Sequence, residues 1–371
     1  MDRFRVVICG GGIAAIEGLL RLRKLVGDAV DVTLIAPDDA LRYRPLAVDR
    51  PFARRGVRDY PLRTIARRTG ADWEQEAVEW LDPDGQVVRT ATGRTFSYDA
   101  LLLAVGARLA RPFEHVTVFD DAHADEAYQG LVQDVEGGYT RSVALVLPEG
   151  PAWLLPAYEL ALMTGERATS MGEEGLAIFL VTPESAPMAA LGDGASRAVA
   201  ELLERARVRV FPNAQPEVPA ARRLLVSPEG PELEAGRIVA MPRIEGRPIQ
   251  NVPSDAGGFV PIDEFCRVRG LGERVFAAGD MTDFPIKHGG LGAQMADVAA
   301  AGIAPLVGDA PAPHPLRPVI RGVLHTGTAP LYLTARMENG RIESEVTTEQ
   351  AWPPDEKVVA EELGPFLRTL E

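Results

Sequence analysis

Residues 4–25 read FRVVICGGGIAAIEGLLRLRKL, and this stretch decides the fold. A short apolar run ends in three consecutive glycines, which predicts a buried parallel strand followed by a tight turn. Apolar side chains then recur at helical spacing from Ile13 to Leu22, so a helix follows the turn. The next apolar run, VDVTLIAP at residues 30–37, predicts a second strand and completes a β-α-β unit of about thirty residues.

The glycines fit the pattern G-x-G-x-x-G/A through Gly10, Gly12 and Ala15. Gly10 permits the turn, Gly12 lets a pyrophosphate approach the main chain, and Ala15 lets helix and strand pack closely. The first helical residues, Ile13 and Ala14, present N–H groups to phosphate oxygens. Because the pattern stands between a strand and a helix, it predicts a dinucleotide site. The alternative is a turn that is rich in glycine for packing alone.

The end of the second strand departs from this pattern. An acidic residue usually stands there and holds the ribose hydroxyls, but the chain has Ala36 and Pro37. Asp38 or Asp39 can take that role from just beyond the strand. Otherwise other groups hold the ribose, or the affinity for the nucleotide is lower.

The strand–turn–helix–strand order occurs a second time. SVALVLP at 142–148, LLPAYELALMTG at 154–165 and GLAIFLVTPES at 175–185 predict a strand, a helix and a strand. Two extended segments are expected between Gly257 and the AAGD turn at 277–280. A helix of small residues, a proline-rich linker, a hairpin around ENG at 338–340 and a terminal helix at 355–370 follow. This order predicts an α/β fold with two related nucleotide-binding-type domains.

Composition excludes several classes of protein. A formal net charge of −14 argues against a nucleic-acid partner, because phosphate binding needs clustered Lys and Arg. Only two of the 371 residues are cysteines, which excludes a disulfide framework and favours the cytoplasm. The basic start of the chain resembles a signal peptide, but Asp2 and Glu17 and the missing cleavage site disfavour one. No uninterrupted apolar stretch reaches the roughly 18 residues of a membrane span.

Three motifs carry a family resemblance: GGGIAAIEG at 10–18, YDALLLAVGAR at 98–108 and RVFAAGDMTDFPIKHGGLGAQMADVAA at 274–300. In this order they resemble the flavoprotein pyridine nucleotide–disulfide oxidoreductase superfamily, above all the branch of sulfide:quinone oxidoreductases and type II NADH dehydrogenases. The resemblance covers nearly the whole chain and implies FAD, not NAD, at the first site. It also implies two Rossmann-like domains of the FAD/NAD(P)-binding type, the second inserted in the first, plus a small C-terminal α+β segment. The implied boundaries are 1–118 and 253–315 for the FAD-binding domain, 119–252 for the inserted domain, and 316–371 for the C-terminal segment.

The family resemblance also implies roles for individual residues. Asp280 of the AAGD turn would hydrogen-bond the ribitol, and the helix that starts near Gly289 would aim its N-terminus at the flavin pyrimidine. Lys287 and His288 would lie near the isoalloxazine and are the candidate catalytic residues, although a solvated loop is an equal alternative for His288. The expected cofactor-binding residues are Gly10, Gly12, Ile13, Ala14, Ala15, Ala36, Pro37, Asp38, Arg44, Pro45, Ala104, Val105, Gly106, Gly279, Asp280, Lys287, Gly289, Gly290 and Leu291.

Two family features are missing from the sequence. No C-x-x-C or C-x4-C pair exists, and Cys9 and Cys266 lie in predicted strands, so we expect packing roles and no thiol–disulfide chemistry. The inserted domain has LVLPEGPAWLL at 145–155 where a Gly-rich turn would bind NAD(P)H. Pro148 and Pro151 lack the N–H groups that would bind phosphate, and Glu149 repels phosphate. We therefore do not expect NAD(P)H to bind here in the usual mode. Trp153, with Pro156 and Tyr158, forms either core packing or a wall beside the flavin.

Other chemistry finds little support. The five histidines lack zinc-binding spacing, and we expect no metal site. The acidic cluster DDAHADEAYQ at 120–129 is best explained as a solvated helix start. The terminal helix has an apolar stripe and an acidic polar face. An acidic helix suits docking on the protein itself or in a dimer better than docking on lipid, so stable membrane association is not expected.

Together these observations predict a cytoplasmic, FAD-dependent oxidoreductase without redox-active cysteines. It would pass electrons from an unidentified small-molecule donor to a quinone-like or other acceptor. A non-catalytic flavin-binding or flavin-losing scaffold of the same fold is the alternative from another class, and an NAD(P)H:quinone dehydrogenase is the alternative within the enzymes. The sequence leaves a homodimer open and does not identify the donor.

Overall fold

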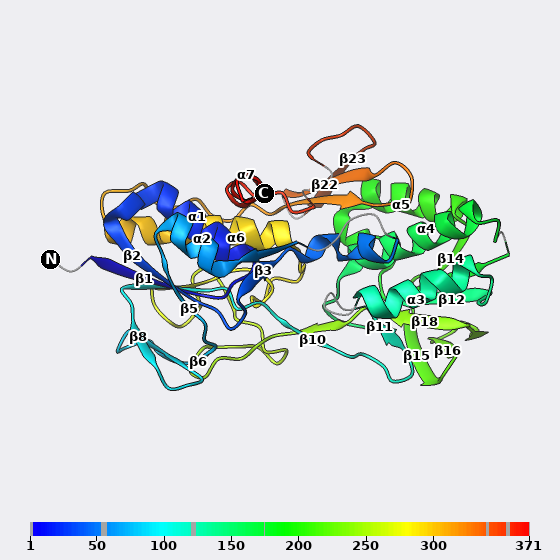
Figure 1. The fold of residues 1–371 in the computed structure, drawn as a ribbon, viewed down its shortest axis with the longest axis horizontal. Helices are drawn as coiled ribbons and strands as arrows, with labels where there is room; N and C mark the ends of the chain where they lie inside the picture. The colour runs from blue at the N-terminus through cyan, green and yellow to red at the C-terminus, as the bar shows by residue number, and fades with distance from the viewer. Residues whose placement is uncertain are drawn as a thin grey trace.

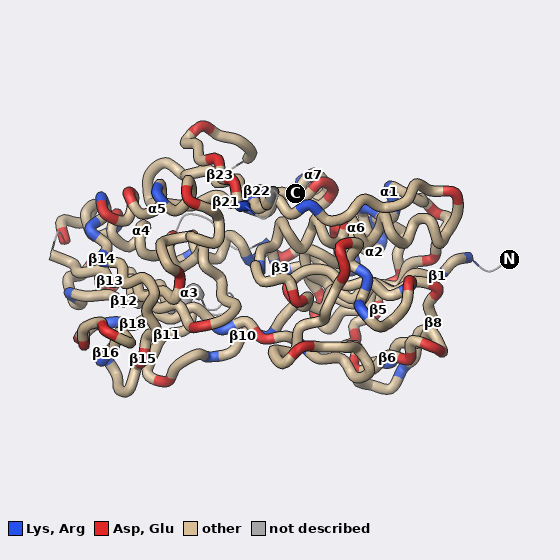
Figure 2. The backbone as a smooth tube through the Cα atoms, turned by 180° about the vertical axis from the view of Figure 1, so that it is seen from behind, with Lys and Arg blue, Asp and Glu red and all other residues tan. Residues whose placement is uncertain are grey.

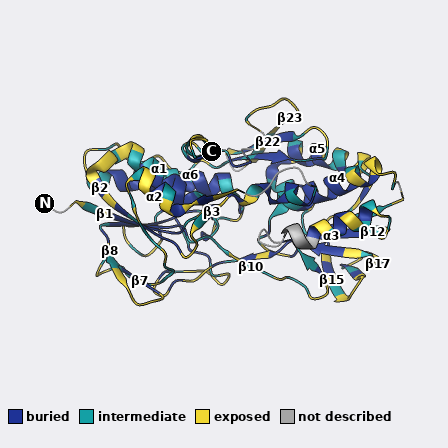
Figure 3. Ribbon diagram, viewed as in Figure 1, coloured by how far each residue is buried: buried dark blue, intermediate teal, exposed yellow. Residues whose placement is uncertain are grey.

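The computed structural model describes residues 3–52, 58–119, 124–173, 175–338, 341–353 and 357–370. Within these residues two parallel sheets, each of five strands, form the centres of two lobes (Figure 1). The structure therefore confirms a mixed α/β fold with parallel sheets. The strands of both sheets are buried, and exposed residues concentrate on the outer helix faces and loops (Figure 3).

The first sheet has the strand order β20-β9-β1-β2-β5. Its strands are β1 (Phe4–Cys9), β2 (Val30–Ile35), β5 (Asp72–Glu74), β9 (Ala100–Leu103) and β20 (Val275–Ala277). Cys9 at the end of β1 is in register with Ile35 and Leu103, so the strands finish together at one edge. Helices α1 (Ile13–Val26) and α6 (Gly289–Val307) pack against each other over this sheet, while α2 (Leu62–Thr69) lies beside α1.

The second sheet has the order β11-β18-β12-β13-β14. Its strands are β11 (Thr117–Val118), β12 (Ser142–Val146), β13 (Ala177–Val181), β14 (Val208–Phe211) and β18 (Arg237–Ala240). Helices α3 (Ala124–Glu136), α4 (Leu154–Ser170) and α5 (Asp193–Arg205) belong to this lobe. The whole sheet comes from a stretch of chain between two strands of the first sheet, β9 and β20, and the predicted strand–helix–strand order of 142–185 is confirmed.

Smaller antiparallel elements connect or extend the lobes. The pair β10 (Arg108–Ala110) and β19 (Arg243–Glu245) lies between the two lobes (Figure 1). An antiparallel meander consists of β6 (Val78–Asp82), β7 (Val87–Thr90) and β8 (Thr95–Ser97), and β3 (Ala40–Arg42) pairs with β4 (Asp59–Pro61). The remaining strands are β15 (Gln215–Ala220), β16 (Arg223–Ser227), β17 (Glu232–Glu234), β21 (Val319–Leu324), β22 (Leu331–Glu338) and β23 (Arg341–Thr347). Three 3-10 segments complete the elements: η1 (Gly27–Ala29), η2 (Arg44–Phe52) and η3 (Ala189–Leu191).

Some predicted elements differ in the structure. The two extended segments after Gly257 form isolated bridges, such as Val260 with Thr282, before the short strand β20. The hairpin of β22 and β23 is present, but its turn at Asn339 and Gly340 lies outside the described residues. The same holds for 120–123 in the acidic cluster, so its solvated helix start stays a prediction.

The terminal helix predicted at 355–370 was wrong in extent, because α7 covers only Leu363–Arg368. Before it, backbone N–H groups donate to side chains of other elements and not to helical carbonyls. The Val358 N–H donates to the Tyr43 hydroxyl at 3.0 Å, and the N–H groups of Glu362 and Leu363 donate to the Glu17 carboxylate. The described residues 357–370, here called the C-terminal strap, thus dock on the protein's own body.

The longest helix, α6, is long and apolar enough to cross a membrane by length and composition alone. The expectation that no uninterrupted apolar stretch is long enough is consistent with this, because Gln294 and Asp297 interrupt the helix. Most of the helix is buried against α1 and the first sheet, as in a core helix. Acidic residues are distributed over both lobes, which agrees with the net charge of −14 (Figure 2).

A buried ion pair fixes the start of the C-terminal strap. The Lys357 ammonium lies 2.6 Å from the Glu159 carboxylate on α4, and both residues are buried. Lys357→Met should lower the free energy of unfolding by about 3–5 kcal/mol, because Glu159 keeps a buried charge without its cation. Urea unfolding measures this, and adding Glu159→Gln should recover part of the loss.

The matched control for Lys357→Met is Lys24→Met. Lys24 also pairs with a glutamate of the C-terminal strap, Glu362 at 2.7 Å, but its side chain is 60% exposed. Loss of that exposed pair should cost about 0–1 kcal/mol. Equal losses in the two variants would contradict the assignment of the Lys357–Glu159 pair as the main attachment.

A second prediction concerns acidic groups between α1, α6 and the C-terminal strap. Burial, together with the nearby carboxylates of Glu17 and Glu361, raises the pKa of Asp297 to about 8. The folded protein therefore keeps a proton that the unfolded chain releases, and the free energy of unfolding should fall as pH rises from about 4 towards about 8. Asp297→Asn remains neutral and should remove this loss, so its stability relative to wild type should grow between about pH 5 and about pH 8. Parallel pH profiles of the free energy of unfolding for the wild type and Asp297→Asn, measured with urea, would contradict the raised pKa of Asp297.

Candidate cofactor site

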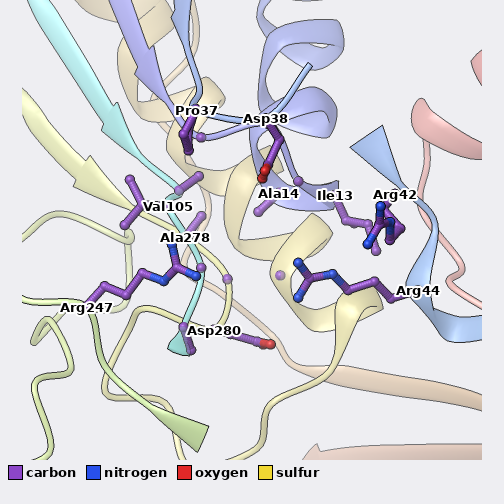
Figure 4. Close-up of a pocket in the computed structure, with 18 of the residues that line it drawn as sticks. Ile13, Ala14, Pro37, Asp38, Arg42, Arg44, Val105, Arg247, Ala278 and Asp280 are labelled. Atoms are coloured by element: carbon purple, nitrogen blue, oxygen red, sulfur yellow. The ribbon is translucent and has the colours of Figure 1, made fainter. Parts of the chain in front are cut away.

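A cavity of about 360 Å³ opens where the carboxyl ends of the first sheet's strands meet. The turn after β1, the segment after β2, the segment after β9 and the turn after β20 all contribute to its wall (Figure 4). Its volume lies in the range of small-molecule sites, and a ligand site at this edge is the rule for parallel α/β sheets.

The structure brings most of the predicted cofactor residues together at this cavity. Those that line it are Gly10, Gly12, Ile13, Ala14, Pro37, Asp38, Arg44, Ala104, Val105, Gly106, Gly279, Asp280 and Gly289. Ala15 and Ala36 are fully buried beneath the turn. Pro45, Lys287, Gly290 and Leu291 are not among the residues that line the cavity.

Two glycines of the turn are needed for different steric reasons. Gly10 has φ +129°, and a Cβ there would lie 2.1 Å from the Ala104 carbonyl oxygen, so only glycine fits between β1 and β9. A Cβ on Gly12 would meet no atom within 4 Å, because this glycine faces the cavity. Gly12 is also the N-cap of α1 and provides no capping side chain. The main chain and the helix N-terminus are thus open to a bound phosphate, and this cradle fits a dinucleotide.

The ribose end of the cavity differs from the usual pattern for a packing reason. The methyl group of Ala36 would lie 3.1 Å from a Cβ on Gly11, so this position is packed beneath the turn. Asp38 lies farther along and lines the cavity, as does Asp39 (Figure 4). The position of Asp38 supports its predicted substitution for the missing acid, which stays a prediction.

Three arginines line the cavity, and two of them were not predicted. Arg42, Arg44 and Arg247 come from separate segments and their guanidinium groups lie around the same space (Figure 4). The Arg42 guanidinium also contacts Asp59 at 3.3 Å. Arginine suits pyrophosphate because it presents several fixed donors. The Pro- and Arg-rich composition of 41–53 was a signal for Arg42, whereas nothing in the sequence indicated Arg247.

Asp280 lies at the opposite end of the cavity from Asp38 (Figure 4). Burial raises the pKa of its carboxyl group, and the positive charges of Lys287 and Arg44 oppose that shift. The adjacent Gly279 has φ +82°, and Gly292 of α6 packs against it. The turn therefore places one carboxylate and the N-terminal turn of α6 at the same end of the cavity.

The two candidate catalytic residues are held by the protein. The Lys287 ammonium donates to the Thr282 carbonyl at 2.5 Å and lies 3.8 Å from the centre of the Phe259 ring. Burial lowers its pKa to about 8. His288 is the N-cap of α6, and its Nδ1 accepts from the Gly290 N–H at 3.2 Å. Burial, and secondarily the charge of Lys357, lowers the pKa of His288 to about 4, so its ring is neutral at pH 7.

Both cysteines are buried and neither lines the cavity, although Cys9 directly precedes Gly10. Burial raises the pKa of the Cys9 thiol, and it raises the pKa of Cys266 to about 12. A thiol with a raised pKa is a poor nucleophile at neutral pH. These positions agree with packing roles for both residues.

Comparisons with known proteins found similar oxidoreductases and dehydrogenase-like proteins. No family model matches the chain. The sulfide-quinone reductase of Aquifex aeolicus is 29% identical over 165 residues, which is 43% of this chain and 38% of that protein. Mouse mitochondrial sulfide:quinone oxidoreductase is 28% identical over 112 residues, 29% of this chain and 24% of that protein. A Mycobacterium tuberculosis NADH dehydrogenase-like protein is 26% identical over 305 residues, 75% of this chain and 72% of that protein.

Solved structures show the same fold over most of the chain. The sulfide:quinone oxidoreductase of Aquifex aeolicus superposes with a TM-score of 0.83 at 21% identity, covering 93% of this chain and 87% of that one. An NAD-dependent persulfide reductase from A. fulgidus gives a TM-score of 0.67 at 17% identity, covering 91% and 64%. These similarities confirm the resemblance predicted from the sequence, and the solved structures show the shared fold. The chain aligns with less than two fifths of the length of the two sulfide:quinone relatives.

Replacing Gly12 with Val should separate cofactor binding from folding. The valine side chain would enter the cavity, so the affinity for FAD should fall by at least about tenfold while the protein stays folded. The control is Gly130→Val on α3, where a Cβ also meets no atom within 4 Å and the cavity is not involved. Gly10→Ala should instead lower the melting temperature, because its Cβ collides with the main chain of β9. Unchanged FAD affinity in Gly12→Val would show that the cofactor binds elsewhere.

Proposed function

We propose that this chain is an FAD-dependent oxidoreductase that passes electrons from a small-molecule donor to a quinone-like acceptor without redox-active cysteines. The observation that carries the proposal is the cavity side of the Gly12 turn, where bare main chain and a free helix N-terminus face the space bounded by Asp280. The names of the similar proteins support the quinone-like acceptor.

Different residues would hold different parts of the cofactor. Gly10, Gly12 and the first turn of α1 would hold the pyrophosphate, with Arg42 and Arg247 as side-chain donors. Asp38 would hold the ribose. Bound FAD supplies two-electron redox chemistry that no side chain provides.

Asp280 and the start of α6 lie at the end of the cavity opposite Asp38. Asp280 would bind the ribitol, as the family resemblance implies, and the α6 N-terminus presents a positive dipole end towards this part of the cavity. Lys287 keeps a cation close to Asp280, although its ammonium is bound to the Thr282 carbonyl. We propose Lys287 and His288 as groups that set the electrostatics beside the cofactor, His288 by capping α6 in its neutral form.

The two sheets support a division into domains. We propose two Rossmann-like domains with the boundaries expected from the sequence: 1–118 with 253–315, an inserted domain at 119–252, and a C-terminal segment at 316–371. A cytoplasmic location and a homodimer also belong to the proposal. The docking of the C-terminal strap on α1 and α4 supports the absence of a stable membrane anchor in this segment.

Absorbance of the purified protein tests the proposal. A flavin spectrum retained through desalting at near one FAD per chain is the expected result, since the cradle is built from main chain. A folded protein that remains colourless after incubation with FAD would contradict the oxidoreductase and support the scaffold.

Stopped-flow bleaching then tests the role of the cysteines. We expect slow or no bleaching by sulfide, because neither thiol lines the cavity. With whichever donor bleaches the wild type, the variant Cys9→Ala/Cys266→Ala should keep the same rate. Rapid bleaching by sulfide that is lost in this variant would contradict the cysteine-free proposal.

A further inference from the structure

One side chain connects the second lobe to the cofactor cavity. Of the described residues that line the cavity, Trp153 is the single one from residues 117–240. It is the N-cap of α4 and ends the turn that follows β12. In a nucleotide-binding lobe this turn would be the glycine-rich loop. An indole therefore stands where that loop would open towards the cavity.

The main chain beside Trp153 is held by strand β19. The Ile244 N–H donates to the Pro151 carbonyl at 2.9 Å, and Ala152 bridges Arg243. Both partners belong to β19, which pairs with β10 between the lobes. The main chain next to Trp153 is thus held by a short sheet.

The rest of the turn cannot hold a dinucleotide. Pro148 and Pro151 have no N–H to offer to a phosphate. The Glu149 carboxylate accepts from Gln215 at 3.1 Å and adds a negative charge to the turn. A pyrophosphate would therefore meet missing donors and a like charge.

In the second lobe, the acidic residue that would bind the ribose of a nucleotide instead contacts other side chains of the protein. Glu184 follows β13, where an acid would bind ribose hydroxyls. Its carboxylate instead accepts from the Tyr158 hydroxyl at 2.5 Å, and the Thr182 hydroxyl lies 3.4 Å away. Tyr158 is fully buried on α4. One oxygen of the Glu184 carboxylate, Oε2, is thus already bound by the protein's own hydroxyl groups.

We propose that Trp153 is the specificity-determining residue of the cofactor cavity. Its indole closes the side that faces the second lobe, so that the electron donor is a small molecule without a nucleotide that reaches the cofactor from another side. The inference rests on the proposed function, because it assumes that FAD fills this cavity. An aromatic ring at this position closes the gap, and its removal opens a passage of a ring's dimensions.

The test uses FAD-loaded wild type, Trp153→Ala, Trp153→Phe and the control Trp80→Ala. Trp80 lies on β6 under the Arg89 guanidinium and does not line the cavity. The first readout is flavin fluorescence, which an indole quenches by electron transfer when the two rings are in contact. We expect emission to rise several-fold in Trp153→Phe and Trp153→Ala and to stay unchanged in Trp80→Ala.

The second readout is bleaching by two reductants, NADH and 1-benzyl-1,4-dihydronicotinamide, which has the same reactive ring without the nucleotide. Removal of the indole in Trp153→Ala should raise the rate of flavin bleaching by the benzyl compound by about tenfold or more. The rate with NADH should not show saturation in any variant, because the Tyr158–Glu184 bond still fills the ribose position. Trp153→Phe should keep the slow wild-type rates, since a ring still closes the gap.

The outcomes separate this inference from the proposed function. If the wild type binds no FAD, the proposed function fails before Trp153 is tested. If FAD is bound but flavin emission does not change in Trp153→Phe, the indole is not beside the cofactor and this inference alone is overturned. Rapid, saturable bleaching of the wild type by NADH would overturn it as well.

Discussion

The structure depends on the close approach of two strands at Gly10. The turn after β1 passes so near the end of β9 that a Cβ would lie 2.1 Å from the Ala104 carbonyl oxygen. The Gly10 N–H donates to the Ile35 carbonyl, and the Ala104 N–H donates to the Cys9 carbonyl. These contacts lock three strand ends together and leave Gly12 facing outward over the cavity. The proposed recognition of a pyrophosphate thus depends on the same main-chain packing that closes the sheet.

Buried charged side chains attach the C-terminal strap to both lobes, and this is the second constraint on the structure. Lys357 reaches Glu159 in the second lobe, whereas Glu17 in the first lobe accepts two N–H groups of the C-terminal strap. Val358 lies against Gly289 at the start of α6, next to the cavity. The last part of the chain therefore fastens both lobes around one end of the proposed cofactor site. Burying these charges is tolerated because each is paired or hydrogen-bonded.

Local patterns predicted the first lobe well, because a parallel strand with a glycine turn has a strong signature. The spacing of Gly10, Gly12 and Ala15 defined both the β-α-β unit and the part of the cavity it lines. Contacts between distant segments could not be predicted in this way. Arg247 reaches the cavity from after β19, and nothing in its neighbouring residues marks it. The terminal helix was overestimated because helical periodicity carries no information on the side chains of Glu17 and Tyr43, which capture its N–H groups.

The most direct measurement is a crystal structure grown with excess FAD. We expect electron density for the FAD pyrophosphate against the main chain of Gly10–Gly12, with the flavin end near Asp280 and the first turn of α6. A well-folded crystal in which this cavity is empty or filled by a protein side chain would contradict it.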